Sequence, residues 1–294
     1  MACSASSVKT KIRRVLRGPL IRVVSDPLGG SGAVLVLLVL IAALFADVIT
    51  AHSAIAIAPT NRFQPPGLTH LLGTDNLGRD LFARVVYGSR IALGVSLGST
   101  ALSLLIGVGA GLAAGYGPSW LDDMLLLIFD ALKSIPAVLL ALALVTLLGP
   151  SVFAVVVVVI ITSAPSYARI ARTQTLAIRQ AEFVLAERAL GAGVARIMLS
   201  HILPNIIGPI LIVAAMGIPV VVAIEAGMSF LGLGVRPPTP SWGSILNDGF
   251  SYILDSPWLV VAGALPIMIT TLGFTFLGEA LRDAFDPKRS GTPL

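Results

Sequence analysis

Long apolar runs alternate with short polar intervals along most of the chain. An apolar run of about 18 or more residues is long enough to cross roughly 30 Å of hydrocarbon as a helix. Six such spans are predicted, over residues 33–51, 91–116, 120–148, 152–168, 206–226 and 258–277. The third span contains Pro136, which lacks a backbone donor and predicts a kink or a break in the helix.

The composition leads to the same class of protein. Hydrophobic residues make up 56% of the chain and charged residues only 12%, which is not the composition of an ordinary soluble domain. The sequence therefore predicts an all-α integral membrane protein with six transmembrane helices. Residues 33–280 form the expected membrane domain, with residues 1–32 and 281–294 as segments outside the bilayer.

The net charge of +5 is interpreted as a topology signal. Basic residues are frequent before the first span and between the fourth and fifth spans, and basic segments favour the cytoplasmic side. They include Lys9, Lys11, Arg13, Arg14, Arg17, Arg22, Arg169, Arg172, Arg179, Arg188 and Arg196. Both termini are therefore expected in the cytoplasm, with the chain crossing the membrane several times. Five arginines on the outer side weaken the rule without reversing it, and no basic cluster is left to indicate a nucleic-acid partner.

Candidate chemistry is sparse. Cys3 is the only cysteine, which excludes an intramolecular disulfide and a cysteine-based metal cluster. The three histidines, His52, His70 and His201, have no neighbour at metal-ligand spacing in the sequence. Phosphate-loop, HExxH and GxSxG motifs are also missing. The chain is therefore expected to hold no metal or cofactor and to catalyse no covalent step.

Asp130 and Lys133 are the exception among the spans, since they are ionisable and lie about one helical turn apart. They can pair on one face of the third span. This candidate ion pair would either stabilise a kinked helix or take part in gating.

The interval 181–205, AEFVLAERALGAGVARIMLSHILPN, is polar and lies between the fourth and fifth spans. Its two halves carry apolar residues at helical spacing, and Gly191 and Gly193 between them predict a bend. The interval is thus expected to be a helix-turn-helix. Such a hairpin either lies on the bilayer surface or forms a docking surface for a soluble partner.

This interval resembles the cytoplasmic EAA loop of ABC-type importer permeases, in which the EAA triplet is followed after three residues by Gly. The match here is LAERALG, residues 185–191, and continues to the HILPN ending. Leu185 and Glu187 stand where the family usually has Glu and Ala. The resemblance assigns ATPase coupling to Glu182, Ala186, Glu187, Ala189, Gly191, Ala192, His201, Leu203 and Pro204.

Three further stretches are similar to the C-type subunit in the dipeptide, oligopeptide and nickel branch of these permeases. They are HLLGTDNLGRDLFARVVYGSRIAL from His70, EAGMSFLGLGVRPPTPSWGSILNDG from Glu225, and GEALRDAFDPKRS from Gly278. The charges of the first stretch alternate in sign, so it can neutralise itself through ion pairs as an interfacial anchor or a dock. The second is rich in Gly and Pro and predicts a compact loop, either an outer gate or a structural turn. Its candidate gate residues are Phe230, Leu231, Gly232 and Trp242.

The resemblance implies a fold like that of a type I ABC importer permease, and a subunit for importing dipeptides and short oligopeptides. It also implies the partners: a second related permease in a heterodimer, one or two cytoplasmic ATPases that bind ATP and Mg²⁺, and an extracytoplasmic substrate-binding protein. Nickel, free or chelated, is the alternative cargo, and spans without His or Cys favour peptide weakly. An ATP-independent channel, a secondary transporter and a membrane scaffold stay open as other classes, distinguished by whether uptake needs ATP.

Overall fold

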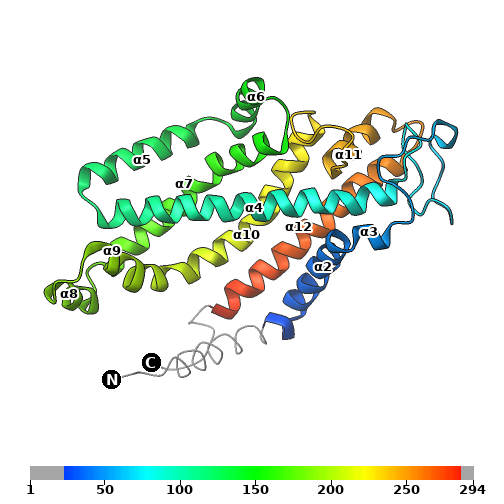
Figure 1. The fold of residues 1–294 in the computed structure, drawn as a ribbon. Helices are drawn as coiled ribbons and strands as arrows, with labels where there is room; N and C mark the ends of the chain where they lie inside the picture. The colour runs from blue at the N-terminus through cyan, green and yellow to red at the C-terminus, as the bar shows by residue number, and fades with distance from the viewer. Residues whose placement is uncertain (1–22, 286–294) are drawn as a thin grey trace.

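A computed structural model describes residues 23–285 as a set of helices joined mostly by short turns, with one long connector over residues 50–80 (Figure 1). An isolated bridge between Thr74 and Asp80 is the only β pairing in the part of the chain that is described. The elements in chain order are α2 (Pro27–Leu44), α3 (Ala46–Ile49), η1 (Pro59–Asn61), α4 (Leu81–Tyr116), α5 (Ser119–Ser134), α6 (Ala137–Leu148), α7 (Val152–Ile178), α8 (Glu182–Ala189), α9 (Val194–Arg196), the π-helical η2 (Ile197–Ile202), α10 (Leu203–Phe230), α11 (Trp242–Ser251) and α12 (Trp258–Phe285).

Five stretches of helix are long and apolar enough to cross a membrane: α2, α4, α7, α12, and α10 together with α9 and η2. The pair α5 and α6 passes the same test only jointly, with a bend of 91° between its halves. Counted as one broken span, this pair brings the total to six. The predicted all-helical membrane fold is therefore confirmed, and the break falls at Pro136 as expected.

Several helix ends differ from the predicted ones. α2 begins at Pro27 because the Asp26 carboxylate accepts a hydrogen bond from the Gly29 amide at 2.9 Å and caps the helix. α4 begins at Leu81 rather than at residue 91, and α12 continues to Phe285, inside the expected tail. Residues 1–22 and 286–294, with the basic residues of the amino-terminal segment, lie outside the described part.

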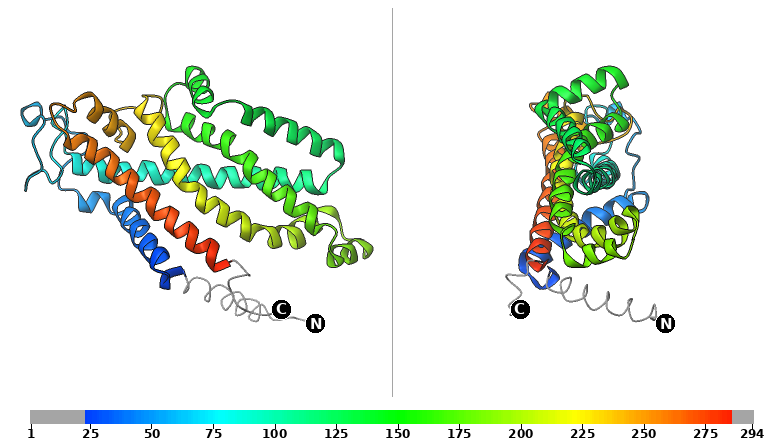
Figure 2. Two further views of the ribbon diagram at one scale, coloured as in Figure 1. Left: turned by 180° about the vertical axis from the view of Figure 1, so that it is seen from behind. Right: turned by 90° about the vertical axis from the view of Figure 1, so that its left-hand side faces the viewer.

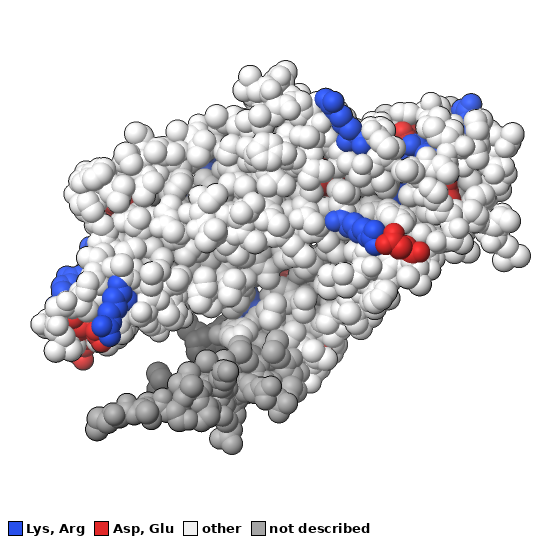
Figure 3. All heavy atoms as spheres, viewed as in Figure 1, with Lys and Arg blue, Asp and Glu red and all other residues white. Residues whose placement is uncertain are grey.

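The long helices run roughly along one direction, and the turns gather at the two ends of the molecule (Figures 1 and 2). One end carries α8 and α9 and is here called the α8 end. The opposite end carries α11 and the 50–80 connector and is called the α11 end. On the face seen in Figure 3, charged side chains gather mainly near these two ends, with a mostly uncharged band between them. This distribution fits a molecule whose middle lies in lipid.

α4 and α7 pack closely along each other (Figures 1 and 2). Gly107 and Gly111 of α4 face α7 so closely that a Cβ at Gly111 would lie 2.6 Å from the Cβ of Ala171. Small residues of this kind allow two helices to approach closely. Gly94, Gly98 and Gly109 of the same helix would meet no atom within 4 Å. These three glycines therefore face away from the other helices of residues 23–285.

Candidate functional site

The predicted helix-turn-helix is present at the α8 end. α8 ends at Ala189, and Gly191 follows with a φ of +81°, a conformation that side chains with a Cβ rarely adopt. The Gly191 amide donates to the Arg188 carbonyl and the Ala192 amide donates to the Glu187 carbonyl, both at 3.0 Å. These two bonds form the Schellman motif that ends many helices. Gly193, also expected at the bend, has an ordinary φ of −67°.

The second half of the segment does not stop at a loop before the next span. α9, η2 and α10 form a continuous stretch of 37 residues, Val194–Phe230. Pro204 lies where η2 passes into α10, and because proline has no backbone amide the stretch lacks one helical hydrogen bond at this point. The segment is therefore rigidly joined to a helix that reaches the α11 end.

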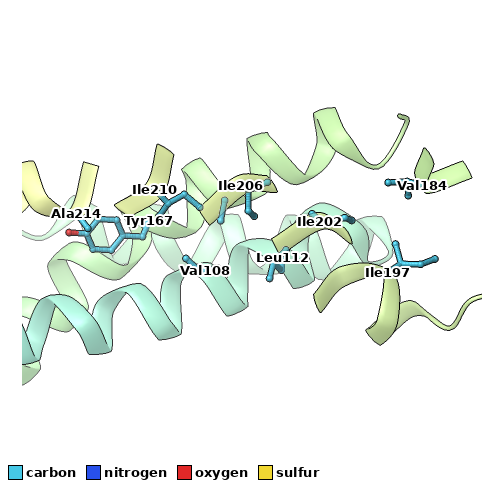
Figure 4. Close-up of a cluster of buried hydrophobic side chains, with 10 residues drawn as sticks. Val108, Leu112, Tyr167, Val184, Ile197, Ile202, Ile206, Ile210 and Ala214 are labelled. Atoms are coloured by element: carbon cyan, nitrogen blue, oxygen red, sulfur yellow. The ribbon is translucent and has the colours of Figure 1, made fainter. Parts of the chain in front are cut away.

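A hydrophobic core lies directly beneath the helix-turn-helix (Figure 4). Val184 of α8 and Ile197 and Ile202 of η2 are fully or almost fully buried. They pack with Val108 and Leu112 of α4 and with residues of α7 and α10. Phe183 of the same helix is 46% exposed, so Val184 is the residue by which α8 joins the core.

Polar contacts also fix the segment. Glu187 and His201 bring α8 and η2 together, with 3.7 Å between Oε1 and Nε2. Arg188 donates to the Tyr116 hydroxyl at 3.1 Å and lies over the Tyr116 ring. The Arg179 guanidinium donates to the Gly115 carbonyl at 3.0 Å, so the chain entering α8 is tied to the end of α4.

Five large apolar side chains of this ordered segment are nevertheless exposed. We call them the coupling surface: Phe183, Leu185, Leu190, Val194 and Leu199. Leu190 is 82% exposed. None of these five was predicted as a site residue, because their exposure depends on how the helix-turn-helix packs on the core.

The candidate coupling residues from the sequence lie on α8, in the turn, in η2 and at the start of α10. Those with exposed side chains or backbone are Glu182, Ala186, Ala189, Gly191 and Pro204, and those partly buried are Glu187, Ala192, His201 and Leu203. They therefore surround the coupling surface. No covalent or metal chemistry is indicated by this set.

The α11 end is built around four charged residues that we call the Asp75 network: Asp75, Arg79, Arg84 and Asp248, of which the first three are buried and Asp248 is partly exposed. Asp75 is fully buried and accepts from the Arg79 Nε at 2.6 Å, from Arg84, and from the Leu77 and Arg79 amides. Asp248 of α11 lies 3.3 Å from Arg84 Nη1. Pairing with hydrogen bonds on both sides is what makes buried charge tolerable.

The ion pairing expected for this stretch is thus present in part, but in the interior rather than on an interfacial surface. Arg90 pairs elsewhere, with Asp47 at 2.8 Å. The hydrogen bond from Arg90, together with one from Tyr87, holds the pKa of the Asp47 carboxyl below its usual value. Asp80 caps α4 by accepting from the Ala83 amide at 2.7 Å and contacts no arginine side chain among the described ion pairs.

His70 contacts Asp80, with 2.7 Å between Nδ1 and Oδ1, and the His52 ring lies 4.9 Å from the His70 ring between centroids. Spacing along the sequence could not indicate this contact. The residues are far apart in the sequence, and only the fold of the connector brings them together.

The candidate gate residues separate into two groups. Leu231 and Gly232 are exposed and begin the loop 231–241, and Phe230 at the end of α10 packs edge-on against the Phe250 ring. Trp242 starts α11 and is 1% exposed, and its indole donates to the Val85 carbonyl at 2.9 Å. Trp242 therefore anchors α11 on α4 and does not project from the loop.

The loop 231–241 lies beside the Asp75 network. Arg79, Arg84, Arg236 and Asp248 all line one polar cavity of about 330 Å³. Glu225 is buried one turn below in α10, where its Oε1 accepts from the Ser229 hydroxyl at 2.9 Å. Ser229 in turn accepts from the Val235 amide at 3.3 Å, which links this carboxyl group to the loop.

The ion pair expected between Asp130 and Lys133 is not among the ion pairs of the described residues. Asp130 instead pairs with Arg169 of α7, with 2.5 Å between Oδ1 and Nη2. Asp122, two turns earlier in α5, likewise pairs with Arg172. Both carboxylates point across to α7, so the contacts hold α5 against its neighbour rather than stabilising a turn of α5.

Comparison with known proteins gives a consistent picture. Residues 107–291 match the family described as "Binding-protein-dependent transport system inner membrane component". The chain is 38% identical over 257 residues to the dipeptide transport system permease protein DppC of Alkalihalophilus pseudofirmus, covering 87% of this chain and 84% of the relative. It is 34% identical over 287 residues to the oligopeptide transport system permease protein OppC of Bacillus subtilis, covering 98% and 94%. A glutathione transport system permease protein, GsiD of Escherichia coli, is 38% identical over 262 residues, covering 89% and 86%.

A solved structure titled "Inward facing conformations of the MetNI methionine ABC transporter" contains a chain that superposes with a TM-score of 0.57. The alignment covers 69% of this chain and 97% of the other, at 19% sequence identity. At this identity the likeness concerns the fold of the membrane domain.

Proposed function

The chain belongs to the family of binding-protein-dependent transport system inner membrane components, and from that premise we propose that it is one permease subunit of an ATP-driven importer of dipeptides and short oligopeptides. Its helices make it a multi-pass membrane protein. Full-length relatives with the names of peptide and glutathione permeases favour peptide over nickel as cargo. The observation that carries the proposal is the coupling surface, an exposed apolar patch on a rigid segment.

The α8 end is proposed to face the cytoplasm. Arginines gather there on α7, α8 and α9: Arg169, Arg172, Arg179, Arg188 and Arg196. Such an excess is typical of the cytoplasmic side. Because α2 starts and α12 ends on the same side of the molecule as α8 (Figures 1 and 2), both termini would then be cytoplasmic.

A cytoplasmic ATPase subunit would bind the coupling surface. Exposed apolar side chains in an ordered, water-facing segment are typical of protein–protein contacts. The segment is fixed from below by the core and at its turn by the Schellman motif. A surface held in this way requires little ordering on binding, which favours affinity. ATP and Mg²⁺ would be bound wholly by the ATPases, and this chain would supply no catalytic group.

Transport would follow from coupled motion of the helices. The stretch Val194–Phe230 is a continuous helical path from the coupling surface to the loop 231–241. A displacement of α9 is therefore passed to the loop beside the polar cavity at the α11 end. ATP would drive the change if the ATPases bind the two states of the transporter with different affinity.

A second, related permease chain would complete the pathway as a heterodimer. Gly94 and Gly98 face away from the packed interior of this chain, which permits close approach of another helix. An apolar groove of about 310 Å³ between α6, α7 and α10, lined by Ala141, Val158 and Val220 among others, provides a further unfilled surface. A substrate-binding protein would dock at the α11 end and deliver the peptide, so that little cargo selectivity is needed here.

The test is purification of the affinity-tagged chain from its native host in a mild detergent, with mass spectrometry of the proteins that accompany it. Recovery of a second permease and one or two ATPases is expected. Recovery of the chain alone, in a preparation that retains other membrane complexes, would contradict the proposal and favour a channel or scaffold. Deleting residues 182–203 is a poor test, because it removes Val184, Ile197 and Ile202 from the core.

A further inference from the structure

The connector at the α11 end brings three possible metal ligands together. His52 follows α3, His70 lies midway along the connector, and Asp80 caps α4. One donor atom from each residue lies within 4.8 Å of the others. We propose that His52, His70 and Asp80 bind a divalent transition-metal ion with a preference for imidazole, such as Zn²⁺.

Two of the three ligands are held in place by their surroundings. Asp80 is 5% exposed, and its second carboxylate oxygen accepts from the Ala83 amide at 2.7 Å. The His70 carbonyl accepts from the Gly67 and Gly73 amides, both at 2.9 Å, so its backbone is fixed on both sides. A metal site gains affinity when its ligands need no rearrangement.

The geometry of His70 and Asp80 suits binding to one ion. His70 Nδ1 and Asp80 Oδ1 lie 2.7 Å apart, so both atoms can reach one Zn²⁺ at the bond lengths of about 2.0–2.2 Å that it takes to nitrogen and oxygen. The exposed His52 ring, 4.9 Å away between centroids, lies within reach as a second imidazole. Two imidazoles and one carboxylate suit Zn²⁺, Ni²⁺ or Cu²⁺, whereas Ca²⁺ and Mg²⁺ prefer oxygen ligands.

The electrostatic surroundings also permit a cation. Arg79 precedes Asp80 in the sequence, but its guanidinium is directed to Asp75 at 2.6 Å and to Asp248 at 3.6 Å. A positive charge that is already paired opposes metal binding less than a free one. Because the three ligands come from separate parts of the chain, the ion would clamp the connector to the start of α4.

The test uses the full-length protein in lipid nanodiscs, stripped of metal with a chelator and carrying a tag without histidine. Cys3→Ser removes the one thiol that would also bind metal. Titration calorimetry with Zn²⁺ is expected to give one site per chain, with no comparable heat from Ca²⁺ or Mg²⁺. Zn²⁺ is also expected to raise the melting temperature.

His52→Ala and His70→Ala should each weaken Zn²⁺ binding at least tenfold, since loss of a mere outer partner already costs about 10- to 100-fold. His201→Ala is the matched control, because His201 is the remaining histidine and lies in η2 at the α8 end. Asp80→Asn keeps an oxygen that can cap α4 and should also weaken binding. Equal Zn²⁺ affinity in His52→Ala, His201→Ala and the parent, or no site at all in the parent, would overturn the proposal. Since His52 is exposed, its variant tests the site without a loss of folding.

Discussion

Leu190 provides the sharpest perturbation of the coupling surface. It follows α8 with 82% of its side chain exposed, and it belongs to none of the buried core clusters in the described chain. Leu190→Ser should therefore leave folding of the permease unchanged. If an ATPase subunit covers this side chain, the substitution removes apolar surface from the contact.

The size of the effect follows from the exposed fraction. Complete burial of a leucine side chain contributes about 1.5–3 kcal/mol. Scaled by the 82% that is free to become buried, the loss is about 1.2–2.5 kcal/mol. Since 1.4 kcal/mol corresponds to a factor of ten, the Kd for the ATPase should rise about 7- to 60-fold.

The assay measures binding of the purified ATPase subunits to nanodiscs that contain this chain and its second permease, with biolayer interferometry as the readout. Leu254→Ser is the matched control, because Leu254 is 97% exposed and follows α11 at the opposite end. The control should bind like the parent. An unchanged Kd for Leu190→Ser, or an equal loss in both variants, would refute docking at the coupling surface.

Three further predictions concern packing and buried charge, and each is checked by thermal unfolding of the purified protein. Asp75→Ala leaves two buried guanidinium groups without their main acceptor and should cost about 3–5 kcal/mol; a variant as stable as the parent would show that the network is open to water. Gly111→Ala forces α4 away from α7 and should cost about 1–3 kcal/mol of stability. Gly109→Ala is the control and should cost nothing, because a Cβ there meets nothing within 4 Å. Equal melting temperatures for the two variants would contradict close packing of α4 on α7 at Gly111. Glu225→Gln keeps the shape of the side chain and the acceptor for Ser229, in a site where an unpaired charge is costly, so it should change stability by less than about 1 kcal/mol. Glu225→Ala removes the acceptor and should cost about 1–3 kcal/mol. A glutamine variant as unstable as the alanine variant would mean that the charge itself is needed.

Apolar run length was enough to find the spans, because a membrane helix must be apolar over most of its length. The break at Pro136 was also predictable, since proline acts on the local backbone. The start of α4 at Leu81 was not predictable in this way. Arg84 and Arg90 look like residues outside a span, and only their carboxylate partners on other segments allow the helix to include them.

In the helix-turn-helix, too, the local feature was predictable and the tertiary contacts were not. Gly191 was identified correctly as the bend, because its conformation is required by the turn itself. Which apolar residues of α8 are buried depends on the position of α4 and α7, so the sequence pattern alone could not show that Val184 is buried and Phe183 exposed. Trp242 was wrongly expected in a loop for a similar reason, since its site on α4 comes from a distant part of the chain. The partners of Asp130 and His70 were likewise set by tertiary structure.

ATP-driven peptide import is best tested by uptake into proteoliposomes. The vesicles would contain this chain with its second permease, ATPases and binding protein, and a radiolabelled dipeptide would be added on the side of the α11 end. Accumulation of the dipeptide is expected to require hydrolysable ATP at the α8 end, to be absent with a non-hydrolysable analogue, and to be reduced by Leu190→Ser. Equal dipeptide entry with and without ATP would contradict ATP-driven import and would make this chain part of a passive pathway.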